Sequence, residues 1–177
     1  ADAYPVTSDL VRQVAEALEA QDPAAVRALT QDLHEADLAD LIALVEPAVR
    51  KHLITALGPI FKPEVLSELE ESIRADVLEC FDYRYPGRDI EIATETEEFT
   101  AVCPFSGLPD FGHLSIVYVP DKRCVELRSL KYYLVSFRNV GIFYEHVCNR
   151  ILDDLVKLTR PKRMEVVCAF TIRGGLK

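Results

Sequence analysis

The first 79 residues have apolar side chains three and four positions apart, which is the spacing of one face of an α-helix. Ser8 and Asp9 can cap the first helix, and Asp22 followed by Pro23 can supply the N-cap and first position of a second. We therefore expect an N-terminal all-α helical array with short helices and tight connections. The apolar positions of the successive helices are Leu10, Val14 and Leu18; Val26, Leu29 and Leu33; Leu38, Leu41, Ile42 and Val45; Leu53, Ile54 and Leu57; and, in one last helix, Val65, Leu66, Leu69 and Ile73.

After Glu79 the pattern changes to alternation of apolar and polar residues in short segments, which is typical of β-strands. Two amphipathic segments and a closing strand follow. This order predicts an α+β unit, ββααβ, in which two helices cover one face of a sheet. The predicted strands are 89–103, 113–119, 124–127 and 164–172, and we expect 124–127 to return from a turn at Pro120-Asp121 and pair with 113–119. The predicted helices are 129–138 and 142–159, the second with one apolar face formed by Phe143, Val147, Ile151, Leu155 and Leu158.

Composition changes at the same place and supports two domains, residues 1–79 and 80–177. The first carries 16 Asp and Glu against 6 Lys and Arg, a net charge of −10, and the second carries 13 against 14, a net charge of +1. All five cysteines lie in the second domain. We interpret the halves as units of different origin or role.

Several classes of protein are excluded by the bulk sequence. The formal net charge of −9 argues against a direct nucleic-acid binder. No run of about 18 apolar residues suits a membrane span, and the N-terminal residues do not resemble a secretory signal. The cysteines are 20 to 24 residues apart without a C-x-x-C pair, so we expect no metal site, free thiols and a cytoplasmic protein.

The segment 98–111 holds the residues most suited to catalysis. A predicted strand ends at Cys103, a loop containing Pro104 and Gly107 follows, and Asp110 comes seven residues after the cysteine. A thiolate can attack an electrophilic carbon while a nearby carboxylic acid protonates the nitrogen that becomes negative. The alternative is a buried cysteine at a strand end and an aspartate that forms a turn.

Two further segments carry candidate binding groups. Arg128 and Lys131 lie three residues apart at a predicted helix start, where cations and free backbone N–H groups suit phosphate, although a solvated basic face is the alternative. Glu145, beside an aromatic residue, can accept two hydrogen bonds from an amidine-like base edge. Alternatively, Glu145 has only a structural role, because the helix dipole favours a negative charge at a helix N-terminus.

The three segments 98–111, 126–133 and 137–146, together with 86–89 and 170–175, resemble the unimodular 7-cyano-7-deazaguanine reductases of queuosine biosynthesis, the QueF family. The resemblance covers residues 76–177. It implies a tunnelling fold whose copies assemble into ring-type homo-oligomers with active sites between subunits. It also implies NADPH as cofactor, a deazapurine nitrile as substrate, and a role in tRNA modification.

The resemblance assigns roles to residues. Cys103 would add to the nitrile and form a covalent thioimide, and Asp110 would protonate the nitrogen. The sequence departs from the family at Arg128, which replaces the usual Lys, and at Tyr144, which replaces the usual His. The resemblance further implies substrate-binding Val125, Glu126, Leu127, Tyr144 and Glu145, and cofactor-binding Arg128, Lys131 and Arg173.

The first half is similar to another family. Segments 24–41 and 63–79 resemble the cytosolic N-terminal domain of MgtE-type magnesium transporters, over residues 8–79, which implies Mg²⁺ sensing and a chimeric chain. Two alternatives to the reductase follow. One is a Mg²⁺-sensing or partner-docking helical module fused to a catalytically idle tunnelling-fold domain, and the other is an amidine-forming relative that makes the thioimide without hydride transfer.

Overall fold

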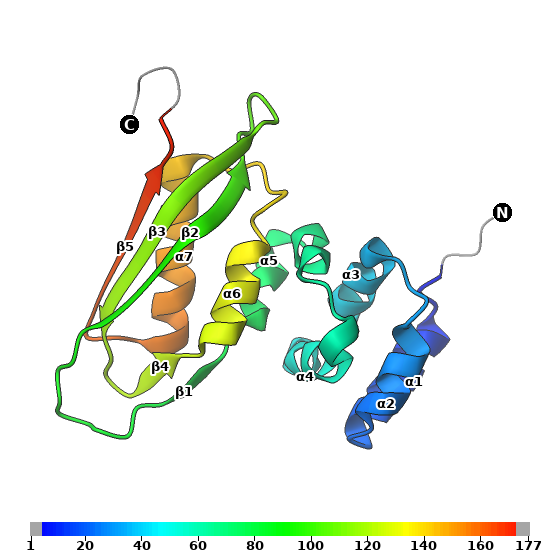
Figure 1. Cartoon of the computed structure of the whole chain (residues 1–177). Helices are drawn as coiled ribbons and strands as arrows, with labels where there is room; N and C mark the ends of the chain where they lie inside the picture. The colour runs from blue at the N-terminus through cyan, green and yellow to red at the C-terminus, as the bar shows by residue number, and fades with distance from the viewer. Residues whose placement is uncertain (1–4, 173–177) are drawn as a thin grey trace. The chain divides into compact units, whose positions relative to one another are not determined.

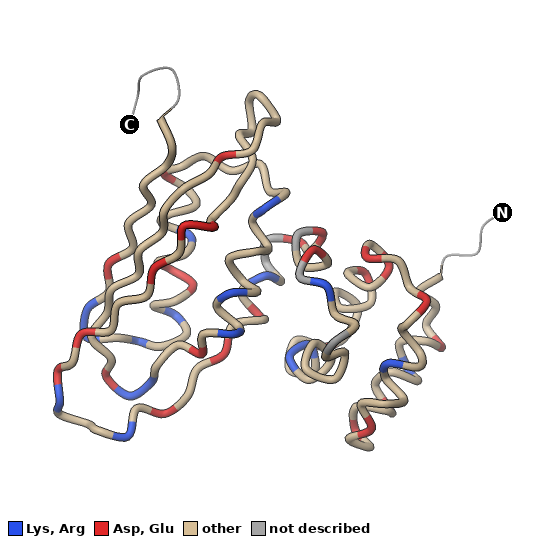
Figure 2. Tube along the Cα trace, in the orientation of Figure 1, with Lys and Arg blue, Asp and Glu red and all other residues tan. Residues whose placement is uncertain are grey.

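The computed structural model describes residues 5–172 and, at 59, 63, 67, 71 and 72, the backbone only. The chain mixes helices and antiparallel sheets and divides into two compact units, residues 1–77 and 78–177 (Figure 1). Figure 2 shows more Lys and Arg positions in the second unit than in the first. None of the helices in the described part of the chain has the length and apolarity of a transmembrane span.

The described residues of the first unit form α-helices and short 3₁₀ helices. The apolar residues chosen from the sequence lie largely in its interior, where Val14, Val26, Leu41, Leu53 and Leu57 are 0% exposed. In chain order the helices are α1 (Ser8–Glu19), α2 (Pro23–Thr30), α3 (Glu35–Leu44), α4 (Pro47–Leu57), η1 (Gly58–Ile60), η2 (Pro63–Glu68), α5 (Glu71–Arg74) and η3 (Ala75–Val77).

The helix starts follow side-chain capping, with one correction. Asp22 caps α2 as predicted, because its carboxylate accepts the N–H groups of Ala24 and Ala25 at 3.1 and 3.0 Å. The cap of α1 is Thr7, whose backbone is extended and whose hydroxyl accepts the N–H of Leu10 at 3.2 Å. The prediction of Ser8 and Asp9 was wrong because both already lie inside the helix.

The segment expected to be one helix through Val65 and Ile73 is divided. The 3₁₀ helix η2 ends at Glu68, and extended backbone at Leu69 and Glu70 separates it from α5. The break directs the Leu69 carbonyl toward Arg74, which donates to it at 2.6 Å. All four apolar positions predicted for this segment are nevertheless buried, so the pattern indicated burial correctly and helix continuity incorrectly.

Arg50 stabilises the first unit. Its guanidinium donates to the carbonyls of Ile42 and Ala43 at 3.1 Å each, near the C-terminus of α3, and pairs with Asp76. Its side chain is only 12% exposed. Because these acceptors would lose a charged donor, we expect Arg50→Gln to lower the free energy of unfolding by about 2 kcal/mol. Urea denaturation followed by far-UV circular dichroism measures this loss.

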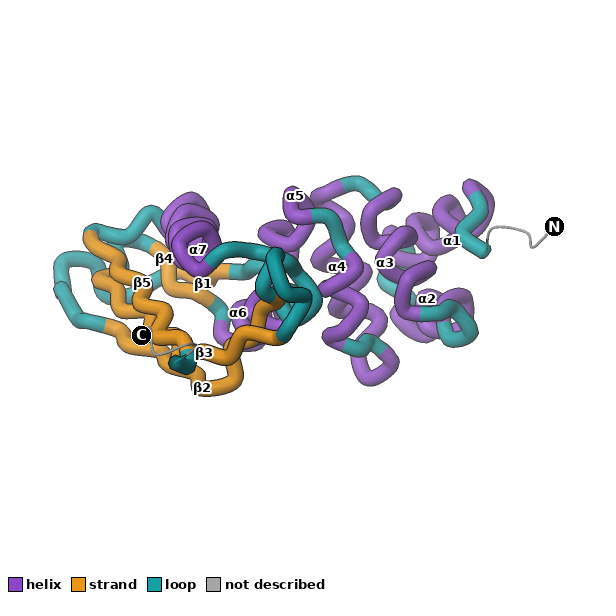
Figure 3. Tube along the Cα trace, turned by 90° about the horizontal axis from the view of Figure 1, so that it is seen from above, coloured by secondary structure: helices purple, strands orange, loops and turns teal. Residues whose placement is uncertain are grey.

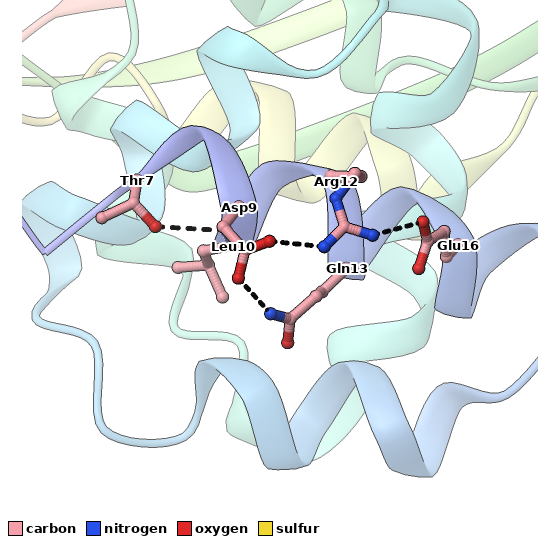
Figure 4. Close-up of polar contacts among 6 residues, drawn as sticks. All are labelled: Thr7, Asp9, Leu10, Arg12, Gln13 and Glu16. Carbon is pink, nitrogen blue, oxygen red and sulfur yellow. Dashed lines mark hydrogen bonds and ion pairs between the residues drawn. The ribbon is translucent and has the colours of Figure 1, made fainter.

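The matched control is Arg12, which pairs with Asp9 and Glu16 on the surface of α1 (Figure 4). Its side chain is 58% exposed, so solvent screens both pairs. Arg12→Gln should therefore lower the free energy of unfolding much less than Arg50→Gln does. Equal effects of the two substitutions would show that the hydrogen bonds of Arg50 do not contribute as described.

Between residues 78 and 172, the second unit forms two antiparallel sheets and two helices. The larger sheet has the order β2-β3-β5, and the smaller pairs β1 with β4, placing Cys80 opposite Val125. The prediction that 124–127 pairs with 113–119 was wrong, because both edges of β3 are already occupied by β2 and β5. The elements are β1 (Cys80–Asp82), β2 (Ile92–Val102), β3 (Pro109–Val119), β4 (Arg123–Val125), α6 (Leu127–Val135), α7 (Tyr144–Thr159) and β5 (Arg163–Phe170).

Helices α6 and α7 lie on one face of the three-stranded sheet (Figures 1 and 3). Side chains of β3 alternate between this covered face and the other, so Leu114, Ile116 and Tyr118 are buried while the residues between them are not. Helix α7 packs its 0% exposed Val147, Ile151 and Leu155 on the unit's core, as the apolar spacing predicted. Phe143 was wrongly placed on this face, because it precedes the helix and is 45% exposed. The covered face of the sheet also holds the candidate site.

Candidate functional site

Cys103 directly follows β2 and begins a tight loop between β2 and β3. Its N–H donates to the carbonyl of Leu108 at 2.9 Å, and the N–H of Gly107 donates to the carbonyl of Cys103 at 2.9 Å. Gly107 has a φ of 67°, a backbone conformation that suits glycine. The loop therefore closes on itself and holds the half-buried thiol at one end of the sheet.

Hydrogen bonds within this loop activate the thiol. The Ser106 side chain, the N–H of Ser106 and the N–H of Phe105 all hydrogen-bond to the sulfur and lower the pKa of Cys103, whereas desolvation and the nearby charge of Asp110 oppose them. The net effect holds the pKa of Cys103 below that of an ordinary thiol. Since the thiolate is the nucleophile, the loop favours its reactive form.

Asp110 lies on strand β3, not in the loop as expected, and is only 2% exposed. It pairs with Ala101, and both side chains are buried on the helix-covered face. Cys103 comes two residues after Ala101, which directs its side chain to the same face. The thiol and the carboxyl group therefore share one end and one face of the sheet.

Tyr144, the first residue of α7, completes this group. Its hydroxyl donates to Asp110 Oδ1 at 2.9 Å. The chain before it is fixed along β2, since the N–H of Val102 donates to Val140 at 2.9 Å and the N–H of Ile142 donates to Val102 at 3.1 Å. Glu145 follows Tyr144 and is exposed in the first turn of α7.

The residues predicted around α6 form a second group. Val125 is buried, whereas Leu127, Arg128 and Lys131 are exposed. Glu126 caps α6, and its carboxylate accepts the N–H groups of Arg128 at 2.9 Å and Ser129 at 2.7 Å. The backbone N–H groups that we expected to be free for phosphate are therefore already hydrogen-bonded.

Glu126 is held as a carboxylate by this arrangement. Desolvation alone would raise its pKa, but the hydrogen bonds from the N–H groups of Ser129 and Arg128 outweigh it and leave the pKa lowered. The carboxylate thus stabilises the start of α6 from within the chain.

Within one chain, β4 and the start of α6 lie far from Asp110. The N–H of Val125 donates to the Tyr118 hydroxyl at 3.0 Å, so β4 and the start of α6 lie near the end of β3. Asp110 is eight residues away along the strand, about 26 Å at about 3.3 Å per residue. In Figure 1 the β2–β3 loop and the start of α6 lie at opposite ends of the sheet.

A cavity of about 230 Å³ lies between α6 and strands β2 and β3. Leu127 and Lys131 line it, but Cys103 and Asp110 do not. Arg173 falls outside the described residues. Within residues 5–172, no group of three or more His, Cys, Asp and Glu side chains is arranged to hold a metal ion.

Sequence reasoning did not select Ser106, Gly112 or Phe170. Ser106 could have been found as a hydroxyl three residues after the cysteine in a tight loop. Gly112 and Phe170 have no local signal, because their importance depends on pairing β3 with β5.

Comparisons with known proteins find relatives of the second unit. Residues 109–177 match the model of the QueF family, described as QueF-like protein. The chain is 55% identical over 104 residues to the NADPH-dependent 7-cyano-7-deazaguanine reductase of Pelodictyon phaeoclathratiforme. This match covers 59% of this chain and 90% of that protein. The chain is 56% identical over 106 residues to the enzyme of the same name from Caldicellulosiruptor bescii, covering 60% of this chain and 81% of the relative.

Among solved structures, the apo crystal structure of the archaeosine synthase QueF-Like matches with a TM-score of 0.39 and 20% identity, over 50% of this chain and 95% of that one.

Proposed function

The chain belongs to the QueF family, and from this premise we propose that residues 78–177 use NADPH to reduce the nitrile of 7-cyano-7-deazaguanine to 7-aminomethyl-7-deazaguanine, in queuosine biosynthesis. The observation that carries the proposal is the placing of Cys103 and Asp110 on one face at one end of the sheet, with the pKa of the thiol lowered. Relatives named as reductases also favour this reading over a catalytically idle domain.

The chemistry follows from the two groups. The Cys103 thiolate adds to the nitrile carbon and forms a C–S bond, while the carboxylic acid of Asp110 transfers its proton to the nitrogen. The triple bond becomes the C=N–H of a covalent thioimide. The carboxylate left on Asp110 accepts the Tyr144 hydroxyl, which stabilises its charge.

NADPH supplies hydride, and reduction of a nitrile to an amine needs two hydrides. Arg128 and Lys131 are exposed cations three residues apart on α6, a spacing that places them on one helix face and suits phosphate groups. We assign them, with Arg173, to cofactor binding. Once the thioimide carbon has gained a hydride, breaking of its C–S bond would release the Cys103 thiolate and leave an imine, which the second hydride would convert to the amine.

Substrate recognition is assigned to both groups of residues. Tyr144 contacts Asp110 and Glu145 follows it in α7, whereas Val125, which precedes Glu126 and Leu127, contacts Tyr118 about 26 Å away along β3. A site that uses both groups therefore needs two chains. We propose a tunnelling-fold homo-oligomer in which the residues around Asp110 of one chain face the residues at the start of α6 of a neighbouring chain. We place the reaction in the cytoplasm, with no direct nucleic-acid or membrane partner.

The first unit carries a separate proposal. Its resemblance to the N-terminal domain of MgtE-type transporters stays a prediction, and we assign the all-α unit a role in Mg²⁺ sensing or partner docking. Thermal stabilisation by millimolar Mg²⁺ without any response to the nitrile would favour a regulatory module over an enzyme.

The full chain provides the decisive assay. We expect addition of 7-cyano-7-deazaguanine to consume two NADPH per nitrile and to give the aminomethyl product. The absorbance of NADPH measures the first, and mass spectrometry detects the second. A thioimide adduct without NADPH consumption would instead identify an amidine-forming relative. Absence of both adduct and NADPH consumption would refute the proposed reaction.

A further inference from the structure

Phe170, the last residue of β5, lies against the tyrosine that contacts Asp110. Its ring and that of Tyr144 are stacked, with centroids 3.8 Å apart and planes 7° from parallel. A third ring, Phe99, meets Phe170 edge-on at 6.3 Å and 67°. Phe170 is therefore held on one side by the sheet's core and on another by the first residue of α7.

Gly112 makes this position possible. It pairs with Phe170 across β3 and β5. A Cβ added at Gly112 would lie 3.0 Å from Cδ1 and 3.3 Å from Cε1 of Phe170, which is tighter than most such contacts, so the ring would have to shift by a few tenths of an ångström. Since Asp110 is two residues before Gly112, all these groups share the helix-covered face.

The stack has a consequence for Asp110. The phenolic oxygen of Tyr144 lies on the Cβ–Cγ axis, so turning the ring about that axis leaves it in place. Rotation about the Cα–Cβ bond instead carries the hydroxyl away from Asp110 Oδ1, which it contacts at 2.9 Å. A parallel ring at 3.8 Å restricts that rotation.

We propose, resting on the proposed function, that Phe170 is a positioning residue that holds the Tyr144 hydroxyl on the catalytic acid Asp110, and that Gly112 makes room for its ring. The group on which Phe170 acts is the carboxylate that remains after Asp110 has protonated the nitrile nitrogen. Phe170 itself does not need to touch the substrate.

Kinetics of thioimide formation test this role. Phe170→Leu removes the stack and keeps the hydroxyl, whereas Tyr144→Phe removes the hydroxyl and keeps the stack. We expect each to slow formation of the adduct about 10- to 100-fold, since a hydrogen bond to a charged group is removed. The double variant should be no slower than Tyr144→Phe alone, because Phe170 acts through that hydroxyl.

Two further variants separate positioning from folding. Phe170→Tyr keeps a ring and should retain the wild-type rate. Gly112→Ala should slow the reaction in the wild-type background but have no further effect beside Phe170→Leu, which removes the contacted ring. Additive losses in the double variant with Tyr144→Phe, or an unchanged rate in Phe170→Leu, would refute the proposal.

A spectroscopic measurement is independent of activity. The near-UV circular dichroism difference between wild type and Tyr144→Phe reports the ordered tyrosine, and we expect it to be largely lost in the Phe170→Leu background. Its persistence there would overturn the positioning role. If the wild type forms no adduct, the proposed function fails, and this measurement still decides whether Phe170 positions Tyr144.

Discussion

Replacement of Cys103 by alanine is expected to abolish the covalent adduct with 7-cyano-7-deazaguanine and to lower turnover by at least ~10³-fold, since no other group supplies the nucleophile. The loop after β2 holds this sulfur and lowers the pKa of Cys103 through hydrogen bonds from Ser106 and Phe105. Intact mass spectrometry of the full chain, with one equivalent of nitrile and no NADPH, measures the adduct directly.

The matched control is Cys80→Ala, which removes another half-buried thiol, on β1. It should form the adduct at the wild-type rate. Alkylation of Cys103 should have its midpoint at a lower pH than alkylation of an ordinary, unperturbed thiol, because hydrogen bonds in the loop lower the pKa of Cys103. Ser106→Ala removes a hydrogen bond that favours the thiolate, so it should raise the pKa and move the midpoint to higher pH. An adduct on Cys103→Ala would assign the nucleophile elsewhere.

Asp110→Asn is expected to slow thioimide formation about 10²- to 10⁴-fold, the usual contribution of a positioned general acid. Asparagine has nearly the same shape and keeps an oxygen that can accept the Tyr144 hydroxyl, but it has no acidic proton to give to nitrogen. The rate of adduct formation at saturating nitrile measures this loss without requiring hydride transfer.

The control for this substitution is Asp153→Asn, which changes an exposed carboxylate on α7. Its rate should match that of the wild type. Binding of the nitrile to Asp110→Asn should change much less than the rate, since the acid acts on the developing negative charge. Adduct formation by Asp110→Asn at the wild-type rate would remove Asp110 from the reaction.

Local chemistry in the sequence was sufficient for much of the secondary structure. Asp22 and Pro23 marked the start of α2, because an N-cap and a first-turn proline act within a few residues. Apolar spacing indicated the buried face of α7 through Val147, Ile151 and Leu155. The strand ending before Cys103 was likewise readable, since alternation and a Pro/Gly loop bounded it.

The pairing partners of strands and the continuity of helices were harder to predict from the sequence. The alternation of 124–127 indicated a strand but not its partner, which is β1, because β3 has neighbours on both edges. Val65 and Ile73 were correctly expected to be buried, yet the backbone between them is extended at Leu69 and Glu70. The N–H groups at the start of α6 were expected to be free, and only the cap by Glu126 shows otherwise.

The sequence by itself determined which chemical groups this protein carries and where along the chain they stand: a cysteine after a strand, an acid seven residues later, and two cations on a helix. Only the tertiary structure decided that the thiol and the acid share a face, that Phe170 reaches Tyr144, and that Val125, just before α6, lies against Tyr118, about 26 Å from Asp110 along β3. The physical reason is that caps and periodicity depend on neighbours in the chain, whereas strand register and ring stacking depend on residues far apart in it.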